Sequence, residues 1–197
     1  MYVKMVIAFM LLWLVTAVTA MVLVRYVKLK NNLFVFHIST PIQYIILCTL
    51  YKSVILNARI KRIIAVSIFC FIVLSIFFSA FIQLPASNNS YVVSIESVIM
   101  IFLSLYYLRE ILLLQQVTVL HRFPMFWISI GILFYFTGIL LIEGMLNYMI
   151  IHSMELAKRS YMIENLFEYL LFVLFIIGAF CNKNSLASLK KTIRNPR

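Results

Sequence analysis

The sequence has few charged residues and no aspartate. Charged side chains make up 12% of the 197 residues, and all six acidic residues are glutamates. Apolar residues make up 64%, and the mean hydropathy is +1.06. Soluble domains carry about 25% charged and about 45–50% apolar residues. The composition therefore excludes a soluble globular domain and predicts an integral membrane protein.

Motifs of known enzyme chemistry are also absent. The sequence has no His-Glu-x-x-His, no Gly-x-Ser-x-Gly, no phosphate-binding loop and no closely spaced cysteine pair. The three cysteines lie in or beside apolar runs, where we expect them to pack as buried thiols. With three histidines and no aspartate, we expect no catalytic residues, no metal and no cofactor. A metal site built from His37, Glu96 and Glu143 is the alternative.

Six apolar runs are present, and each reaches the roughly 20 residues that cross a bilayer. They cover residues 5–24, 33–56, 63–84, 91–114, 124–151 and 161–181. Only helices and closed barrels satisfy their backbone groups in lipid, and the alternation of barrel strands is missing. The sequence therefore predicts an all-α bundle of six transmembrane helices as one domain, residues 1–181, followed by a basic tail at residues 182–197.

The first run also has features of a cleaved signal peptide. Lys4 precedes it, and Val18-Thr19-Ala20 is similar to a small-residue cleavage site. Apolar residues continue to Val24, however, and Arg25 follows. We therefore interpret this run as a membrane anchor and keep the signal peptide as the alternative.

The distribution of positive charge predicts the orientation. The net charge is +11, and six spans divide the 17 basic residues between two sides. Twelve fall on the side of the two termini: Lys4, Lys52, Arg59, Lys61, Arg62, Arg109, Arg122, Lys183, Lys190, Lys191, Arg194 and Arg197. The other five are Arg25, Lys28, Lys30, Lys158 and Arg159. The positive-inside bias predicts that both termini are cytoplasmic.

Short basic clusters between apolar runs are typical of contact with anionic lipids. We therefore expect membrane lipids as partners and do not expect nucleic acid, which is the other class of partner for a basic chain. We also expect a protein partner or a homo-oligomer.

One face of residues 91–114 is polar. At 100° per residue, a face about 140° wide carries Glu96, Ser97, Ser104, Tyr107 and Glu110. Placing an ionisable residue inside a span costs free energy, so such residues are functional candidates by default. We expect this face to look into the bundle. The alternative is a structural stripe that hydrogen-bonds neighbouring helices.

Two further stripes follow helical spacing. Residues 33–56 carry one at intervals of 4, 3, 4 and 3, with Lys52 at its inner end: His37, Pro41, Tyr44, Cys48 and Tyr51. A bonded core histidine is the alternative to a functional His37. In residues 124–151, one side carries Trp127, Gly131, Gly138 and Ile142. Small residues on one side predict close helix packing there.

Depth groups the candidate residues into two sets. Towards the non-cytoplasmic ends we expect His37, Glu96, Glu143, Glu164 and Glu168. Towards the cytoplasmic ends we expect an ion-paired boundary formed by Arg109, Glu110 and Lys52. The alternative for Glu96, Glu164 and Glu168 is that they lie in first helical turns, where the helix dipole favours anions by about 0.3–1 kcal/mol.

Several segments carry a family resemblance: Asn31-Asn32-Leu33-Phe34, followed by Pro41 and Tyr44; Leu103-Ser104-Leu105-Tyr106-Tyr107-Leu108-Arg109-Glu110; and residues 124–138. Together they resemble a group of small multi-span bacterial inner-membrane proteins associated with signalling contexts. The resemblance covers the second to fifth spans and implies no functional residues.

Our first hypothesis is therefore a sensor- or receptor-like module of the bacterial inner membrane. An outer polar pocket would bind a small ligand, a lipid headgroup or a cation and act through a partner. The candidate binding residues, for ligand or proton, are Glu96, Glu143, His37, Tyr44, Tyr107 and Glu168. The second hypothesis is an oligomeric transporter or channel that uses the same face. The third is an intramembrane lipid-modifying enzyme, with Glu96 as base and His37 as its partner.

Overall fold

Six long helices make up the bundle in the computed structural model, which describes residues 2–28, 32–83, 87–114, 120 and 123–181. The helices are α1 (Tyr2–Arg25), α2 (Phe34–Val54), α3 (Ala58–Phe81), α4 (Ser90–Leu114), α5 (Pro124–His152) and α6 (Met154–Phe180). Each is long and apolar enough to cross a membrane. The predicted six-helix membrane bundle is confirmed, and the tail after Cys181 lies outside the described residues.

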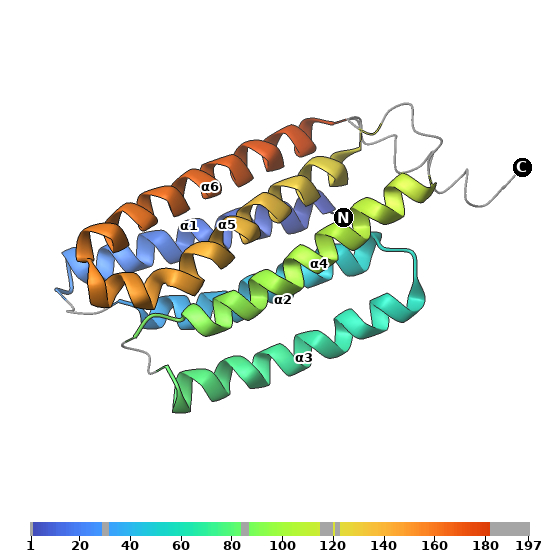
Figure 1. Ribbon diagram of the computed structural model, residues 1–197. Coiled ribbons are helices and arrows are strands. Elements are labelled where there is room, and N and C mark those ends of the chain that lie inside the picture. The colour runs from blue at the N-terminus through green and yellow to red at the C-terminus, as the bar shows by residue number, and fades with distance from the viewer. Residues whose placement is uncertain (1, 29–31, 84–86, 115–119, 121–122, 182–197) are drawn as a thin grey trace, which may run out of the picture.

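Five helices form a ring, and α3 lies outside it. Helix α5 packs against α4 and α6, α2 packs against α1 and α4, and α1 meets α6. Helix α3 packs against α2 and α4, and it runs along one side of the ribbon in Figure 1. Its outer face is strongly apolar: Phe69 is 70% exposed and Ile76 is 65% exposed. That face suits lipid.

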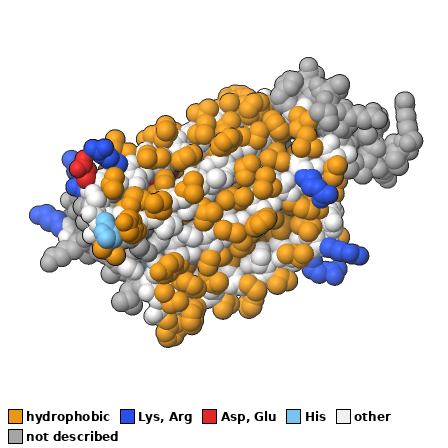
Figure 2. Space-filling model, viewed as in Figure 1, with side chains coloured by type: hydrophobic (Ala, Val, Ile, Leu, Met, Phe, Trp, Pro, Cys, Tyr) orange, Lys and Arg blue, Asp and Glu red, His pale blue; other side chains and the backbone are white. Residues whose placement is uncertain are grey.

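Apolar and charged side chains are distributed over the outer surface as they are in membrane proteins. In Figure 2 apolar side chains cover the middle of the visible face, and the charged side chains lie at its two ends. We call the end where α2, α4 and α6 begin the cavity end, and the opposite end the closed end. At the cavity end the described basic residues are Arg25, Lys28, Lys158 and Arg159. At the closed end they are Lys4, Lys52, Arg59, Lys61, Arg62 and Arg109.

Helices α3 and α6 begin at least five residues earlier than the apolar runs predict, because side chains cap them. The Asn57 side chain accepts a hydrogen bond from the Arg59 N–H at 2.9 Å, so α3 includes its basic cluster. Ser153 Oγ accepts from the Leu156 N–H at 3.3 Å and starts α6 seven residues before Tyr161. Polar caps of this kind satisfy backbone donors that the first turn leaves unpaired.

Small residues let α5 and α6 approach closely. An added Cβ at Gly138 of α5 would meet the Phe167 ring of α6 at 2.5 Å. At Gly178 of α6 it would meet the Pro124 carbonyl oxygen of α5 at 2.8 Å. The close packing predicted for the glycine side of α5 is thus present, and it brings the carboxylates of α6 beside Glu143 of α5.

Candidate functional site: a carboxylate-lined cavity

A cavity of about 340 Å³ lies inside the ring at the cavity end. All five ring helices contribute to its wall, and none of the described lining residues belongs to α3. It extends from Leu33 and Asn88, at the end of the bundle, to Trp13 and Gln43, near the middle of α1 and α2. Its size is typical of small-molecule sites, which range from about 300 to 1,000 Å³.

Three carboxyl groups line the cavity without a basic residue beside them. Glu96 comes from α4, Glu143 from α5 and Glu164 from α6. Glu96 is 1% exposed, and Glu143 is 8% exposed. Among the described lining residues there is no Lys, Arg or His. The described basic residues therefore lie outside the cavity, whose described wall is acidic.

The fourth carboxyl group lies next to the cavity rather than in its wall. Glu168 is one helical turn after Glu164, and it is 5% exposed. Its Oε1 is buried without a hydrogen-bond partner among the described residues. It adds a fourth carboxyl group behind the α6 wall.

Helix dipoles do not explain these carboxylates. Helix α6 begins at Met154, so Glu164 and Glu168 lie in its interior, and only Glu155 is in the first turn. Helix α4 has no acidic residue in its first turn. Because the effect of the dipole fades within one turn, the first-turn alternative is wrong. The apolar run begins after the true start of α6, which Ser153 caps, so the run alone does not locate that start.

The chain between α3 and α4 holds the mouth of the cavity together. The Asn88 side-chain amide donates to Glu143 Oε2 of α5 at 3.2 Å. The Asn89 side-chain amide donates to Thr40 Oγ1 of α2 at 3.2 Å. Both asparagines also line the cavity. This connection therefore links α2 to α5 across the opening.

The orientation of the Asn89 amide follows from its partner. The Thr40 hydroxyl donates to the Phe36 carbonyl at 2.8 Å. Its only proton is thus used, and it must accept from the Asn89 NH₂ group. Asn89 Oδ1 is then left as a bare acceptor, buried and without a partner among the described residues. This oxygen is one unsatisfied group of the cavity wall.

Glu96 provides the second unsatisfied acceptor. The Gln43 side chain is its hydrogen-bonding neighbour. Even so, Glu96 Oε1 is buried and has no hydrogen-bond partner among the described residues. Buried polar atoms in native proteins are nearly always paired, so each exception needs an explanation. Two unpaired acceptors in the wall of one acidic cavity have a common explanation if a donor enters from outside.

Apolar side chains close the inner side of the cavity. One helical turn beyond the lining residues Trp13, Gln43, Glu96 and Phe136, each helix presents an almost fully buried apolar residue. We call this layer the apolar floor: Phe9, Leu47, Met100 and Ile132. All four belong to the continuous hydrophobic core. The cavity is therefore blind in this structure.

A second polar layer lies beyond the apolar floor, and its hydroxyls pair with one another. The Tyr51 hydroxyl of α2 is 2.8 Å from Ser104 Oγ of α4 and 3.4 Å from Ser129 Oγ of α5. We call these three residues the hydroxyl network. Ser104 also donates to the Met100 carbonyl at 2.8 Å. Because these groups satisfy one another, this layer joins helices and has no need of a ligand.

Several predicted site residues lie away from the cavity. His37 is buried on the side of α2 that faces α3: Nδ1 is 2.8 Å from Ser79 Oγ, and Nε2 donates to the Ser87 carbonyl at 3.0 Å. Both ring nitrogens are engaged, which leaves neither for Glu96. The Tyr44 hydroxyl donates to Ser67 of α3 at 3.0 Å.

The remaining predicted site residue, Tyr107, lies in the closed half of the bundle. Its ring meets Tyr51 edge-on, with centroids 6.2 Å apart. Of the predicted binding residues, Glu96 and Glu143 therefore share the cavity wall, and His37, Tyr44, Tyr107 and Glu168 do not contribute to it.

The predicted ion pair at the closed end is replaced by a backbone contact. Both oxygens of Glu110 lie 3.2 Å from the Leu56 nitrogen in the α2–α3 connection and accept from its N–H. In the described part of the chain the one ion pair is Arg159–Glu155, so Glu110 forms none with Arg109 or Lys52. The Leu56 N–H, just after the end of α2, donates to the carboxylate, and Arg109 is exposed and does not pair with it.

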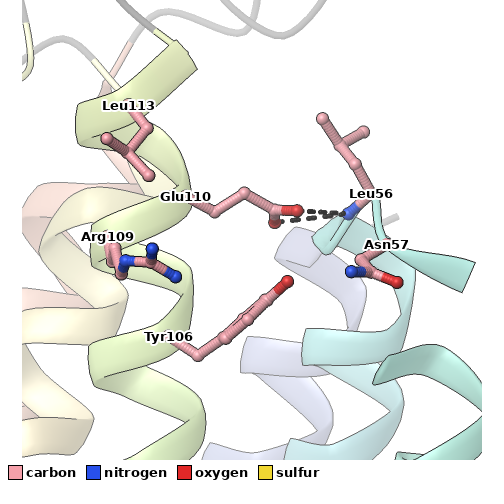
Figure 3. Close-up of a pocket in the computed structure, with 6 residues that line it drawn as sticks. All are labelled: Leu56, Asn57, Tyr106, Arg109, Glu110 and Leu113. Atoms are coloured by element: carbon pink, nitrogen blue, oxygen red, sulfur yellow. Dashed lines mark hydrogen bonds between the residues drawn. The ribbon is translucent and has the colours of Figure 1, made fainter. Parts of the chain in front are cut away.

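This contact lies in a groove of about 430 Å³ at the closed end. Figure 3 shows its six residues, with Glu110 reaching from α4 across to Leu56 and with Arg109 and Tyr106 beside it. The groove is bounded by the connection that follows α2 and by the last turns of α4. These two helices also carry Gln43 and Glu96 in the cavity, so they connect the two ends of the bundle.

Sequence reasoning missed the polar residues of the cavity wall on α2 and before α4. Thr40 and Gln43 form a second polar face of α2, beside the stripe of His37 and Tyr44. Together with Phe36 and Leu47 they also follow helical spacing. This spacing is the signal by which Thr40 and Gln43 could have been identified. Asn88 was missed because it belongs to a connection between spans. A pattern alone does not tell which of two polar faces meets the bundle interior.

In comparisons with known proteins, no family model, no curated protein and no solved structure matches this chain.

Proposed function

We propose that the protein is a sensor- or receptor-like module of the bacterial inner membrane that binds a small ligand in the cavity. The observation that carries the proposal is the pairing of a blind, acidic cavity with an apolar floor. A polar path through the membrane would need polar groups or space at that level. The floor residues Leu47 and Met100 are instead 1% and 0% exposed. This arrangement favours binding over conduction.

The distribution of positive charge supports an orientation with the cavity on the non-cytoplasmic side. The basic clusters of the closed end, such as Arg59, Lys61 and Arg62, would then lie at the cytoplasmic surface. Anionic lipid headgroups attract such clusters, with about 1 kcal/mol for each basic residue near the surface. Membrane lipids are accordingly part of the proposal.

Signalling in this proposal passes along α2 and α4. A ligand at Glu96 or beside Gln43 contacts both helices, and at their far ends the chain just after α2 meets α4 at the Glu110–Leu56 contact. A small shift between the helices would change the groove at the closed end. A partner protein, or a second copy of this chain, would read that change. The described residues provide no catalytic motif for the output.

Side-specific thiol labelling tests the proposal against the transporter or channel alternative. Ser39 lines the cavity, and Ser129 belongs to the hydroxyl network. In proteoliposomes of a protein with Cys70 and Cys181 changed to serine, we expect Ser39→Cys to react with a membrane-impermeant, positively charged methanethiosulfonate from the cavity side only. We expect Ser129→Cys to react from neither side.

Ile38→Cys is the matched control, because Ile38 is adjacent in sequence and 59% exposed on the outer surface of the bundle. It faces lipid, so the charged reagent should not modify it. Reaction of Ser39→Cys from both sides, or of Ser129→Cys from either side, would support a channel. No reaction of Ser39→Cys from the cavity side would mean that the cavity is inaccessible, and the proposed binding site would be wrong.

A further inference from the structure

We infer that the ligand of the cavity presents an organic ammonium group with N–H donors, held by Glu96 Oε1 and Asn89 Oδ1. This inference rests on the proposed binding function and names the chemical class that the site takes. Its first support is the count of donors and acceptors in the wall. Asn89 Oδ1 is an acceptor, and Glu96 Oε1 is an acceptor when Glu96 is ionised; both oxygens are buried, and neither has a partner among the described residues. A ligand that satisfies them must bring donors.

Charge narrows the class further. Three carboxyl groups line the cavity, and no described lining residue is cationic. Buried carboxylates require an opposite charge or several hydrogen bonds. A neutral donor such as an alcohol satisfies one acceptor but leaves the charge of an ionised carboxylate uncompensated. An anionic ligand would add to it. A positively charged donor meets both requirements.

The cavity suits an organic cation better than a bare metal ion. Calcium or zinc needs several ligand atoms within about 2.0–2.6 Å of one point. The described residues contain no group of three or more His, Cys, Asp or Glu side chains placed to hold a metal. The volume of about 340 Å³ also exceeds what one ion fills. The extra room is lined in part by aromatic rings.

These rings provide a second means of recognising a cation. Trp13, Phe36, Tyr135, Phe136 and Tyr161 line the cavity beside the carboxylates. Aromatic faces attract ammonium groups within about 6 Å of the ring centre. Rings alone would serve a quaternary ammonium equally well, but such a group has no N–H to satisfy Glu96 and Asn89. The two unpaired oxygens therefore favour a primary or secondary ammonium.

Trp13 provides a fluorescence signal inside the cavity. The chain has two tryptophans, and Trp127→Phe leaves Trp13 alone. In phosphatidylcholine nanodiscs we expect n-butylammonium to change Trp13 fluorescence saturably. At equal ionic strength, n-butyltrimethylammonium and 1-butanol should bind at least about tenfold more weakly, because neither can pair both acceptors with a charged donor.

Two glutamine variants distinguish a specific contact with Glu96 from a general effect of negative charge on binding. Glu96→Gln keeps the shape and should weaken butylammonium binding by about tenfold or more. Glu155→Gln removes an exposed negative charge at the same end of the bundle and should leave binding unchanged. If Trp127→Phe does not fold, the butylammonium-induced rise of the melting temperature of the wild-type protein provides the same comparison.

The ammonium group has two possible sources, a free amine or the headgroup of phosphatidylethanolamine. Replacing phosphatidylcholine with phosphatidylethanolamine of the same acyl chains distinguishes them. Weaker apparent butylammonium binding in the second lipid identifies the headgroup as a competitor. Unchanged binding identifies a free amine, and both results retain the ammonium inference.

Other results would overturn it. Equal, saturable binding of the quaternary or the neutral compound would leave a binding site but refute the ammonium class. Absence of saturable binding by butylammonium, or binding unaffected by Glu96→Gln, would refute the inference. In that case the labelling of Ser39→Cys decides separately whether the cavity is accessible, so the proposed function can survive or fail independently.

Discussion

The two halves of this bundle differ in whether their buried polar groups have hydrogen-bond partners. In the closed half, the hydroxyls of Tyr51, Ser104 and Ser129 pair with one another across three helices. In the cavity half, Glu96 and Asn89 each keep an unpaired buried oxygen. Polar residues in a membrane interior therefore have two uses here. Where they satisfy each other they join helices, and where acceptors stay unpaired around a cavity we propose that they bind a ligand.

Packing also differs between Gly178, in the closed half, and Gly144, in the cavity half, and alanine substitutions should show this difference most strongly. A Cβ at Gly178, in the closed half, would lie 2.8 Å from the Pro124 carbonyl oxygen, so backbone must move. We expect Gly178→Ala to lower the free energy of unfolding by about 1–3 kcal/mol through overpacking. Thermal denaturation in detergent measures the change.

Gly144→Ala is the matched control from the cavity half. A Cβ there meets nothing within 4 Å, so alanine should be neutral or stabilise the helix by up to about 1 kcal/mol. If the two variants melt alike, the contrast in packing between Gly178 and Gly144 is wrong.

Removing one hydroxyl should give the next largest effect. Tyr51→Phe leaves Ser104 and Ser129 without the oxygen that joins them in a fully buried layer. We expect a loss of about 1–3 kcal/mol, the usual range when a buried partner is left unsatisfied. Tyr161→Phe, on a ring that lines the cavity and is 42% exposed, should change stability by less than about 0.5 kcal/mol. Equal losses would contradict the assignment of the two layers.

The sequence predicts the fold well because the signal is strong and physical. Six runs of about 20 apolar residues allow few alternatives in lipid. The polar face of α4 is also predictable, because Glu96 and Ser104 share one side of a helix that cannot be shifted. Helix starts are less certain, since a cap such as Ser153 places charged residues inside a helix whose apolar run begins later.

The candidate site is only half predictable, since it depends on which helices meet. Glu96 and Glu143 are identifiable from their depth in the predicted spans and from the free-energy cost of a carboxylate at that depth. His37 and Tyr44 have the same kind of pattern, yet they bind α3, which lies outside the ring. Thr40, Asn88 and Asn89 become part of the wall only through tertiary contacts. A one-dimensional pattern does not contain this information.

Collisional quenching of the two tryptophans tests the central claim, an acidic and water-accessible cavity confined to one half, most directly. Trp13 lines the cavity, and Trp127 lies near the closed end where α5 begins. In Trp127→Phe we expect Cs⁺ to quench Trp13 more strongly than I⁻, because the carboxylates concentrate cations. Glu96→Gln should reduce that excess. In Trp13→Phe, Trp127 lies on the basic side and should show no preference for Cs⁺. If Trp13 is not quenched by either ion, or is quenched equally by both, the cavity is not the acidic, open site described here.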